Sequence, residues 1–106
     1  MVHDINDNND PGVGHPKRKA IQEYFKDSDS EATAFDGLDS AILGIAEQHA
    51  GVGPLVAYSM RGIIECYVKQ GMDHEEALEF FGHNCQCMST GRGTPIIVDD
   101  YVLEGT

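Results

Sequence analysis

The sequence predicts a small α+β domain, in which two helices pack on one face of a three-stranded sheet. The expected order of elements is strand, strand, helix, helix, strand. Three observations support it: two capped helical patterns, three short apolar runs near glycine or proline, and a length of 106 residues, close to the commonest domain size. The predicted domain covers residues 35–106, and residues 1–34 precede it as a flexible arm.

The predicted arm begins with a polar segment. Residues 1–16 are rich in aspartate, asparagine, glycine and proline and show no periodic apolar pattern, which is typical of a flexible chain. Residues 17–26 fit a short helix with a small apolar face, and the basic run 17–19 is its expected solvated edge. The polar residues 27–33 then link the arm to the domain.

Two apolar runs, residues 41–46 and 55–58, predict the first two strands of the sheet. The loop between them is rich in glycine. A helix over residues 39–49 is the alternative, because Asp39 could cap it and its apolar residues also fit a helical stripe. Gly44 inside the segment and the glycine-rich exit favour the strands.

Ser59 is predicted to cap a helix over residues 60–70, because its hydroxyl can accept a hydrogen bond from a free amide of the first turn. Gly71 then supplies the left-handed position that ends the helix. The predicted buried face contains Met60, Ile63, Ile64 and Tyr67.

Asp73 is predicted to cap the second helix, with Glu76 at the third helical position in a capping-box arrangement. The helix is expected to end by residues 89–93, where glycines break helical order. Pro95 lacks an amide donor and suits the first position of the last strand, which includes residues 96–98. The apolar stripe of this helix contains Ala77, Phe80, Phe81 and Asn84, with Leu78 and Cys85 beside it.

The chain is strongly acidic, with 18 aspartate and glutamate residues, 7 lysine and arginine residues and a net charge of −11. This balance argues against direct binding of nucleic acid by a basic surface. Asp73, Glu75, Glu76 and Glu79 lie within two helical turns and predict an acidic face for a protein partner, for which a basic protein is best suited. The alternative is that the charge is solvated and keeps a small protein soluble.

Metal binding is a candidate because His83, Cys85 and Cys87 are close in sequence. Zinc needs about four nitrogen or sulfur ligands, and His74 and Cys66 are the other residues that could approach. The chain contains no familiar ligand quartet, such as paired CxxC motifs. Buried cysteines and surface histidines are therefore favoured and no cofactor is expected, with zinc as the alternative.

A second chemical candidate is the turn formed by Gly91, Arg92, Gly93 and Thr94. Its amides and guanidinium could face an anion. The turn lacks the lysine and the helix start of a P-loop, and the acidic chain repels phosphate, so a plain helix-to-strand turn is favoured. No thiol or carboxylate is convincingly paired with a base, so no catalytic residue is predicted and an enzyme is disfavoured.

The sequence also indicates a compartment. No apolar run approaches the length of a membrane span, and the N-terminal residues have neither the basic start nor the apolar core of a signal peptide. Three cysteines, an odd number, favour a reducing environment. A cytoplasmic protein without membrane contact is expected, and the oligomeric state is left open.

A set of residues between positions 35 and 99 carries a family resemblance. The residues are Asp36, Ala41, Ile42, Gly44, Tyr58, Gly71, Met72, Glu75, Glu76, Ala77, Asn84, Gly91, Thr94 and Pro95. In their order and spacing they resemble a family of small uncharacterised proteins of tailed bacteriophages, including those of cyanobacteria, and of prophages. The chain departs from that pattern at Cys87, Met88, Ser89 and Arg92. The resemblance implies a phage origin and the cytoplasm of a host bacterial cell, and it implies no activity.

These observations predict a small acidic phage accessory protein that binds and modulates a host or viral protein without catalysing a reaction. Inhibition is one form that the modulation could take. The alternative is a metal- or small-molecule-binding protein, or an enzyme, that uses His83, Cys85 and Cys87 together with the turn from Gly91 to Thr94.

Overall fold

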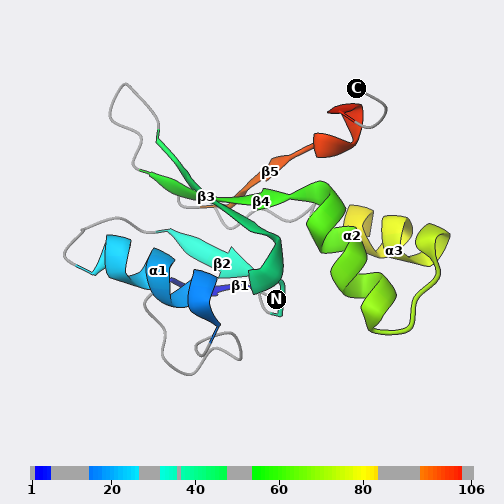
Figure 1. The fold of residues 1–106 in the computed structure, drawn as a ribbon, viewed down its shortest axis with the longest axis horizontal. Helices are drawn as coiled ribbons and strands as arrows, with labels where there is room; N and C mark the ends of the chain where they lie inside the picture. Colours follow the sequence, from blue (N-terminus) through cyan, green and yellow to red (C-terminus); the bar gives the residue numbers. More distant parts are fainter. Residues whose placement is uncertain are drawn as a thin grey trace.

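The computed structural model describes residues 2–5, 15–26, 32–35, 37–47, 54–83 and 94–103. Within these ranges the chain forms a three-stranded sheet, a two-stranded sheet and three α-helices (Figure 1). The predicted α+β class is confirmed, and the strand, strand, helix, helix, strand order holds for the part that follows position 41.

The central strand of the larger sheet is β4 (Leu55–Ser59). β3 (Ile42–Ala46) pairs with it in antiparallel orientation, and β5 (Ile96–Val98) pairs with its other edge in parallel. A parallel pair requires a crossover connection, and α2 (Met60–Lys69) and α3 (His74–Phe81) lie within it. Figure 1 shows the two helices together at the C-terminal end of β4.

In the described part of the segment 39–49, the structure contains the strand that the sequence favoured over a helix. Asp39–Ala41 form a 3₁₀ turn, η1, and β3 follows directly. Gly44 adopts a φ of 150° at a register shift in the pairing of β3 with β4. Glycine suits this irregular position because it has no Cβ, so Gly44 is compatible with the strand.

Both predicted ends of α2 are confirmed. The Ser59 hydroxyl accepts a hydrogen bond from the Gly62 amide at 2.9 Å. At the other end Gly71 has a φ of 108°, and the Met72 amide donates to the Tyr67 carbonyl at 3.2 Å. These are features of a Schellman motif, in which glycine takes the left-handed position. Of the predicted buried face, Ile63, Ile64 and Tyr67 are buried and Met60 is partly buried.

α3 is buried on a narrower stripe than the sequence predicts. Ala77 and Phe81 are buried, as expected. Leu78 and Phe80 are each 37% exposed, although the apolar pattern placed both of them with the buried residues. The remaining members of the predicted stripe, Asn84 and Cys85, lie outside the described residues.

The start of the chain differs from the flexible arm that the sequence predicts. β1 (Val2–Asp4) pairs in antiparallel orientation with β2 (Thr33–Phe35), and Ile5, which follows β1, is 0% exposed. Composition did not reveal this because the apolar residues here are few, yet they are placed where the core covers them. Residues 6–14 and 27–31 of the predicted arm lie outside the described ranges.

α1 (Pro16–Phe25) lies where the short helix is predicted, and it packs into the same core through Ile21 and Phe25. Its basic edge is solvated only in part. Arg18 is 0% exposed and forms an ion pair with the buried Asp39 of η1, with 3.1 Å between Nη1 and Oδ1. Removing one partner of such a pair leaves the other charge buried and unpaired. Asp39 therefore joins α1 to η1 and does not cap a helix over 39–49.

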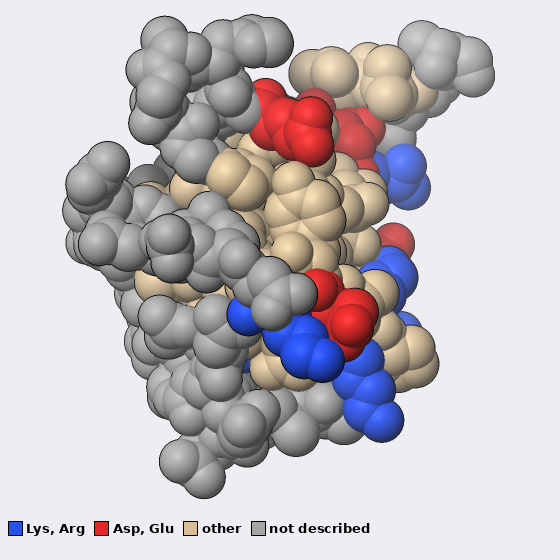
Figure 2. Space-filling view, turned by 90° about the vertical axis from the view of Figure 1, so that its left-hand side faces the viewer, with Lys and Arg blue, Asp and Glu red and all other residues tan. Residues whose placement is uncertain are grey.

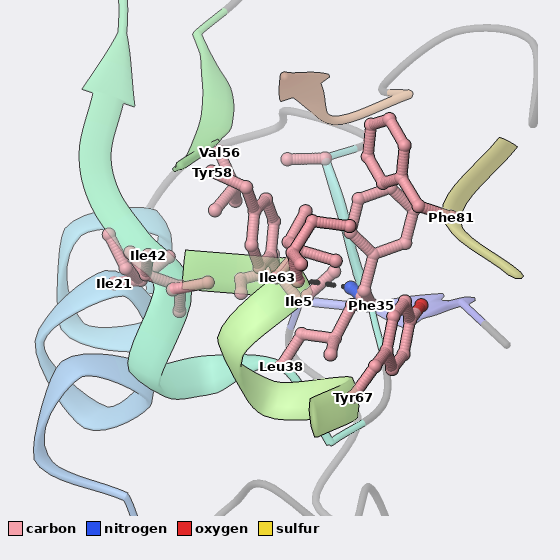
Figure 3. Packing of buried hydrophobic residues seen from close by; sticks show 14 of the residues in the cluster. Ile5, Ile21, Phe35, Leu38, Ile42, Val56, Tyr58, Ile63, Tyr67 and Phe81 are labelled. Carbon is pink, nitrogen blue, oxygen red and sulfur yellow. Dashed lines mark hydrogen bonds between the residues drawn. The ribbon is translucent and has the colours of Figure 1, made fainter. Parts of the chain in front are cut away.

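A hydrophobic core joins the two sheets in the described parts of the chain (Figure 3). The rings of Phe35 in β2 and Tyr58 in β4 lie 4.9 Å apart between centroids, and the Phe35 amide donates to the Tyr58 hydroxyl at 3.0 Å. α2 and η1 approach so closely that a Cβ atom added at Gly62 would lie 2.9 Å from the Cβ of Ala41. Residues before and after position 35 thus share a core.

Candidate functional site

Charged side chains are unevenly distributed over the described residues. α3 contains Glu75, Glu76 and Glu79 and no lysine or arginine, and Asp73 precedes it. All four of these acidic residues are exposed. Figure 1 shows α1 and α3 on opposite sides of the molecule, and Figure 2 shows several lysine and arginine side chains on the side that carries α1, with acidic side chains among them. The acidic face is therefore well separated from the basic run 17–19.

Asp73 is the N-cap of α3, as predicted. Its Oδ1 accepts a hydrogen bond from the Glu76 amide at 2.9 Å. That bond is the main cause of the lowered pKa of Asp73, and it outweighs a smaller opposing effect of desolvation. The N-terminus of a helix also favours negative charge. Asp73 is thus held in its ionised form, with its carboxylate oriented toward the helix backbone.

An open hollow of about 280 Å³ lies along one side of α3. Met72 and Phe80 contribute apolar surface to it, and Glu76 and Glu79 contribute carboxylates. His83 completes the lining. Within α3, Glu76 lies three residues before Glu79 and four before Phe80, which places these three residues on one side of the helix. The hollow therefore combines an aromatic ring, a thioether and two acidic groups.

The Phe80 ring is positioned by α2. Its centroid lies 4.8 Å from that of the Tyr67 ring, with an interplanar angle of 75°, which is a favourable edge-to-face arrangement. Tyr67 is 4% exposed, whereas Phe80 is 37% exposed. Part of the Phe80 ring thus packs on a buried residue, and the rest is accessible in the hollow.

The structure assigns different roles to the four residues of the predicted acidic face. Glu76 and Glu79 line the hollow. Glu75 is exposed on the same helix outside the lining, and Asp73 caps the helix. The helical pattern alone did not reveal the hollow, because it placed Phe80 in the buried stripe. The signal that could have indicated it is the recurrence of Met72, Glu76, Phe80 and His83 at helical spacing.

Asp100 forms a second cap on α2 that the sequence does not predict. Its Oδ1 accepts a hydrogen bond from the Arg61 amide at 3.0 Å, and its Oδ2 accepts one from the Ser59 hydroxyl. Desolvation is the largest single influence and opposes ionisation. The hydrogen bonds from the Ser59 hydroxyl and the Arg61 amide, with the backbone amide of Asp100 and the charge of Arg61, together outweigh it and lower the pKa of Asp100. The 3₁₀ helix η3 (Asp100–Leu103) is thereby attached to the N-terminus of α2.

Most of the zinc and anion candidates lie outside the described residues, namely Cys85, Cys87, Gly91, Arg92 and Gly93. His83 is exposed, and Thr94 is partly buried. Cys66 in α2 contacts the Ser40 hydroxyl at 3.1 Å, and His74 lies at the start of α3. Among the described side chains, no group of three or more histidine, cysteine, aspartate or glutamate residues is arranged to hold a metal ion.

Comparisons with protein-family models, curated proteins and solved structures gave no match to this chain. In the part of the chain that the structure describes, none of the helices has the length and apolar character needed to span a membrane. The functional argument therefore rests on α3, on the hollow beside it and on the distribution of charge.

Proposed function

We propose that this chain is a small accessory protein that binds and modulates a host or viral protein without catalysing a reaction, and that α3 is its contact surface. The observation that carries this proposal is the hollow in which Glu76 and Glu79 adjoin the exposed Phe80 ring. An aromatic residue within an acidic surface resembles the anchors of protein interfaces more than an ordinary solvated helix face.

The proposed partner is a basic protein. The net charge of −11 favours encounter with a positive surface, and the acidic groups of α3 are exposed and uncompensated by any lysine or arginine of that helix. Proteins that grip nucleic acid with a basic surface belong to this class of partner. The resemblance to tailed-phage proteins supports a phage accessory role in the cytoplasm of a bacterial host, with inhibition as one form of modulation.

The test is charge reversal on α3. A partner is first captured from host cells with the full chain, identified and purified. Glu75→Lys with Glu79→Lys should then slow its association, while the fold is retained because both side chains are exposed. The matched control is Glu23→Lys with Glu47→Lys, two exposed positions outside α3 that change the net charge by the same amount. Association should also weaken as salt rises from about 50 to about 300 mM, which shortens the Debye length about 2.4-fold.

Two outcomes would overturn this proposal. The first is association that is unaffected by both charge reversal and salt. The second is an equal loss in the control with Glu23→Lys and Glu47→Lys, which would assign the effect to net charge rather than to α3. In either case the acidic residues of α3 would serve solubility.

A further inference from the structure

We propose that the hollow beside Phe80 is a subsite for one arginine side chain of the partner. This inference rests on the proposed function and adds to it the chemical group that is recognised. The guanidinium would stack on the exposed part of the Phe80 ring and form ion pairs with Glu76 and Glu79, and its methylene stem would lie on Met72.

The size of the hollow suits a single side chain. Pockets for drug-sized ligands have volumes of about 300–1,000 Å³, whereas this hollow has about 280 Å³ and is open to solvent. It is therefore at the lower limit for a separate small molecule. A side chain delivered by a partner protein needs less enclosure, because the rest of the interface contributes to affinity.

The apolar surface of the hollow fits the stem and the plane of an arginine. Arginine keeps its charged group in polar surroundings while its methylene groups cover apolar atoms, here those of Met72. The Phe80 ring already packs on Tyr67, with 4.8 Å between the ring centroids, so little side-chain freedom is lost when the guanidinium packs on its exposed part. Guanidinium groups stack on aromatic faces more often than ammonium groups do.

The carboxylates complete the recognition. Glu76 and Glu79 are three residues apart and therefore lie on the same side of α3. The planar guanidinium presents five donors, so it can bond two carboxylates at once while its face remains on the ring. A lysine ammonium is a compact, strongly hydrated charge that lacks this planar geometry. The same hollow should hence prefer arginine to lysine at equal charge.

The experiment is an NMR titration of the full chain with two short peptides of equal length and charge, one containing arginine and the other lysine. We expect the arginine peptide to bind about 2- to 5-fold more tightly than the lysine peptide. Its addition should shift the resonances of Phe80, Glu76 and Glu79.

Two variants assign the preference to the hollow. Phe80→Leu keeps an apolar side chain and removes the ring, so it should reduce the preference for the arginine peptide and leave only the part that the carboxylates supply. Glu79→Gln should weaken binding of the arginine peptide more than Glu75→Gln does. The second pair is matched, because both residues are exposed on α3 and only Glu79 lines the hollow.

The results separate this inference from the proposed function. Equal affinity for the two peptides, an arginine preference that is undiminished in Phe80→Leu, or equal losses in Glu79→Gln and Glu75→Gln would each overturn the arginine subsite. If association of the purified partner still depends on the charge of α3, the proposed function stands without the arginine subsite. Absence of binding by either peptide also overturns the subsite, and charge reversal with the captured partner then decides the proposed function.

Discussion

Tyr58 contributes both an aromatic ring and a hydrogen-bond acceptor to the core. Its hydroxyl accepts a hydrogen bond from the Phe35 amide at 3.0 Å, and both residues are buried. A buried amide that loses its partner has no water to replace it. This single contact therefore links β2 of the smaller sheet to β4 of the larger one.

Tyr58→Phe should lower the free energy of unfolding by about 1–3 kcal/mol, because it leaves the Phe35 amide buried without this acceptor. Tyr24→Phe is the matched control. The Tyr24 hydroxyl is paired with Glu47 at 3.2 Å, but Tyr24 is 47% exposed, so water can replace that bond and the change should stay within about 0.5 kcal/mol. Urea unfolding measures both values, and equal losses would contradict the structural role of Tyr58.

Sequence reasoning succeeded at the residues whose partners are nearby. The caps at Ser59 and Asp73 depend on amides three residues away, so local rules predict them. The Phe35–Tyr58 bond and the Arg18–Asp39 pair join residues 23 and 21 positions apart. Such partners are brought together only by the whole fold, and no local pattern specifies them.

At the scale of elements, η3 and α2 are joined through Asp100. This carboxylate accepts hydrogen bonds from the Arg61 amide and the Ser59 hydroxyl, so it adds to the capping that Ser59 already provides. An acidic group near a helix N-terminus is also favoured by the helix dipole. The joint is therefore sensitive to the protonation state of Asp100.

We expect the attachment of η3 to α2 to weaken in acid, because Asp100 becomes protonated. Its pKa is lowered in the folded protein, so its stabilising contribution is complete above the ordinary carboxyl pKa of about 3.9 and is lost as the pH falls through the folded-state pKa. Asp100→Asn removes this titration. The stability difference between the original protein and the variant should consequently shrink between about pH 5 and pH 2, as measured by urea unfolding. A difference that is constant with pH would contradict the proposed contribution.

The hollow illustrates what periodicity can and cannot predict about an element. The sequence placed the acidic residues of α3 correctly on an exposed face. It assigned Phe80 to the buried stripe, because an apolar residue three positions after Ala77 fits a helical core pattern. The width of the buried stripe depends on how much of α3 its neighbours cover, and that is a property of the packing.

At the scale of the molecule, the N-terminal part belongs to the same core as the rest. Ile5 is 0% exposed, and its amide donates to the Ala32 carbonyl at 3.0 Å, which continues the pairing of β1 and β2. The sequence predicts the order of elements after position 41 because each has its own apolar run or caps. The pairing of Val2–Asp4 with Thr33–Phe35 joins distant segments of three residues each, which are too short to show a pattern, so composition predicts a flexible arm there.

Ile5→Ala should therefore destabilise the whole molecule by about 2–5 kcal/mol, the usual cost of a large-to-small change in a core. A flexible arm would show almost no effect. The control is Val102→Ala, at a position that is 73% exposed, where a change within about 0.5 kcal/mol is expected. Unfolding should be followed by circular dichroism and by tyrosine fluorescence, and transitions that do not coincide would show that the two parts unfold separately.

The direct passage from β4 into α2 has a mechanical consequence. Ser59 is both the last residue of the strand and the cap of the helix, so no connecting loop lies between Leu55–Ser59 and Met60–Lys69. Hinge motion needs residues that can change their backbone angles, and here the junction is held by hydrogen bonds to Gly62 and Asp100. Because α3 packs on α2 through the Phe80 and Tyr67 rings, a protein bound to α3 would be held at a fixed angle to the sheet.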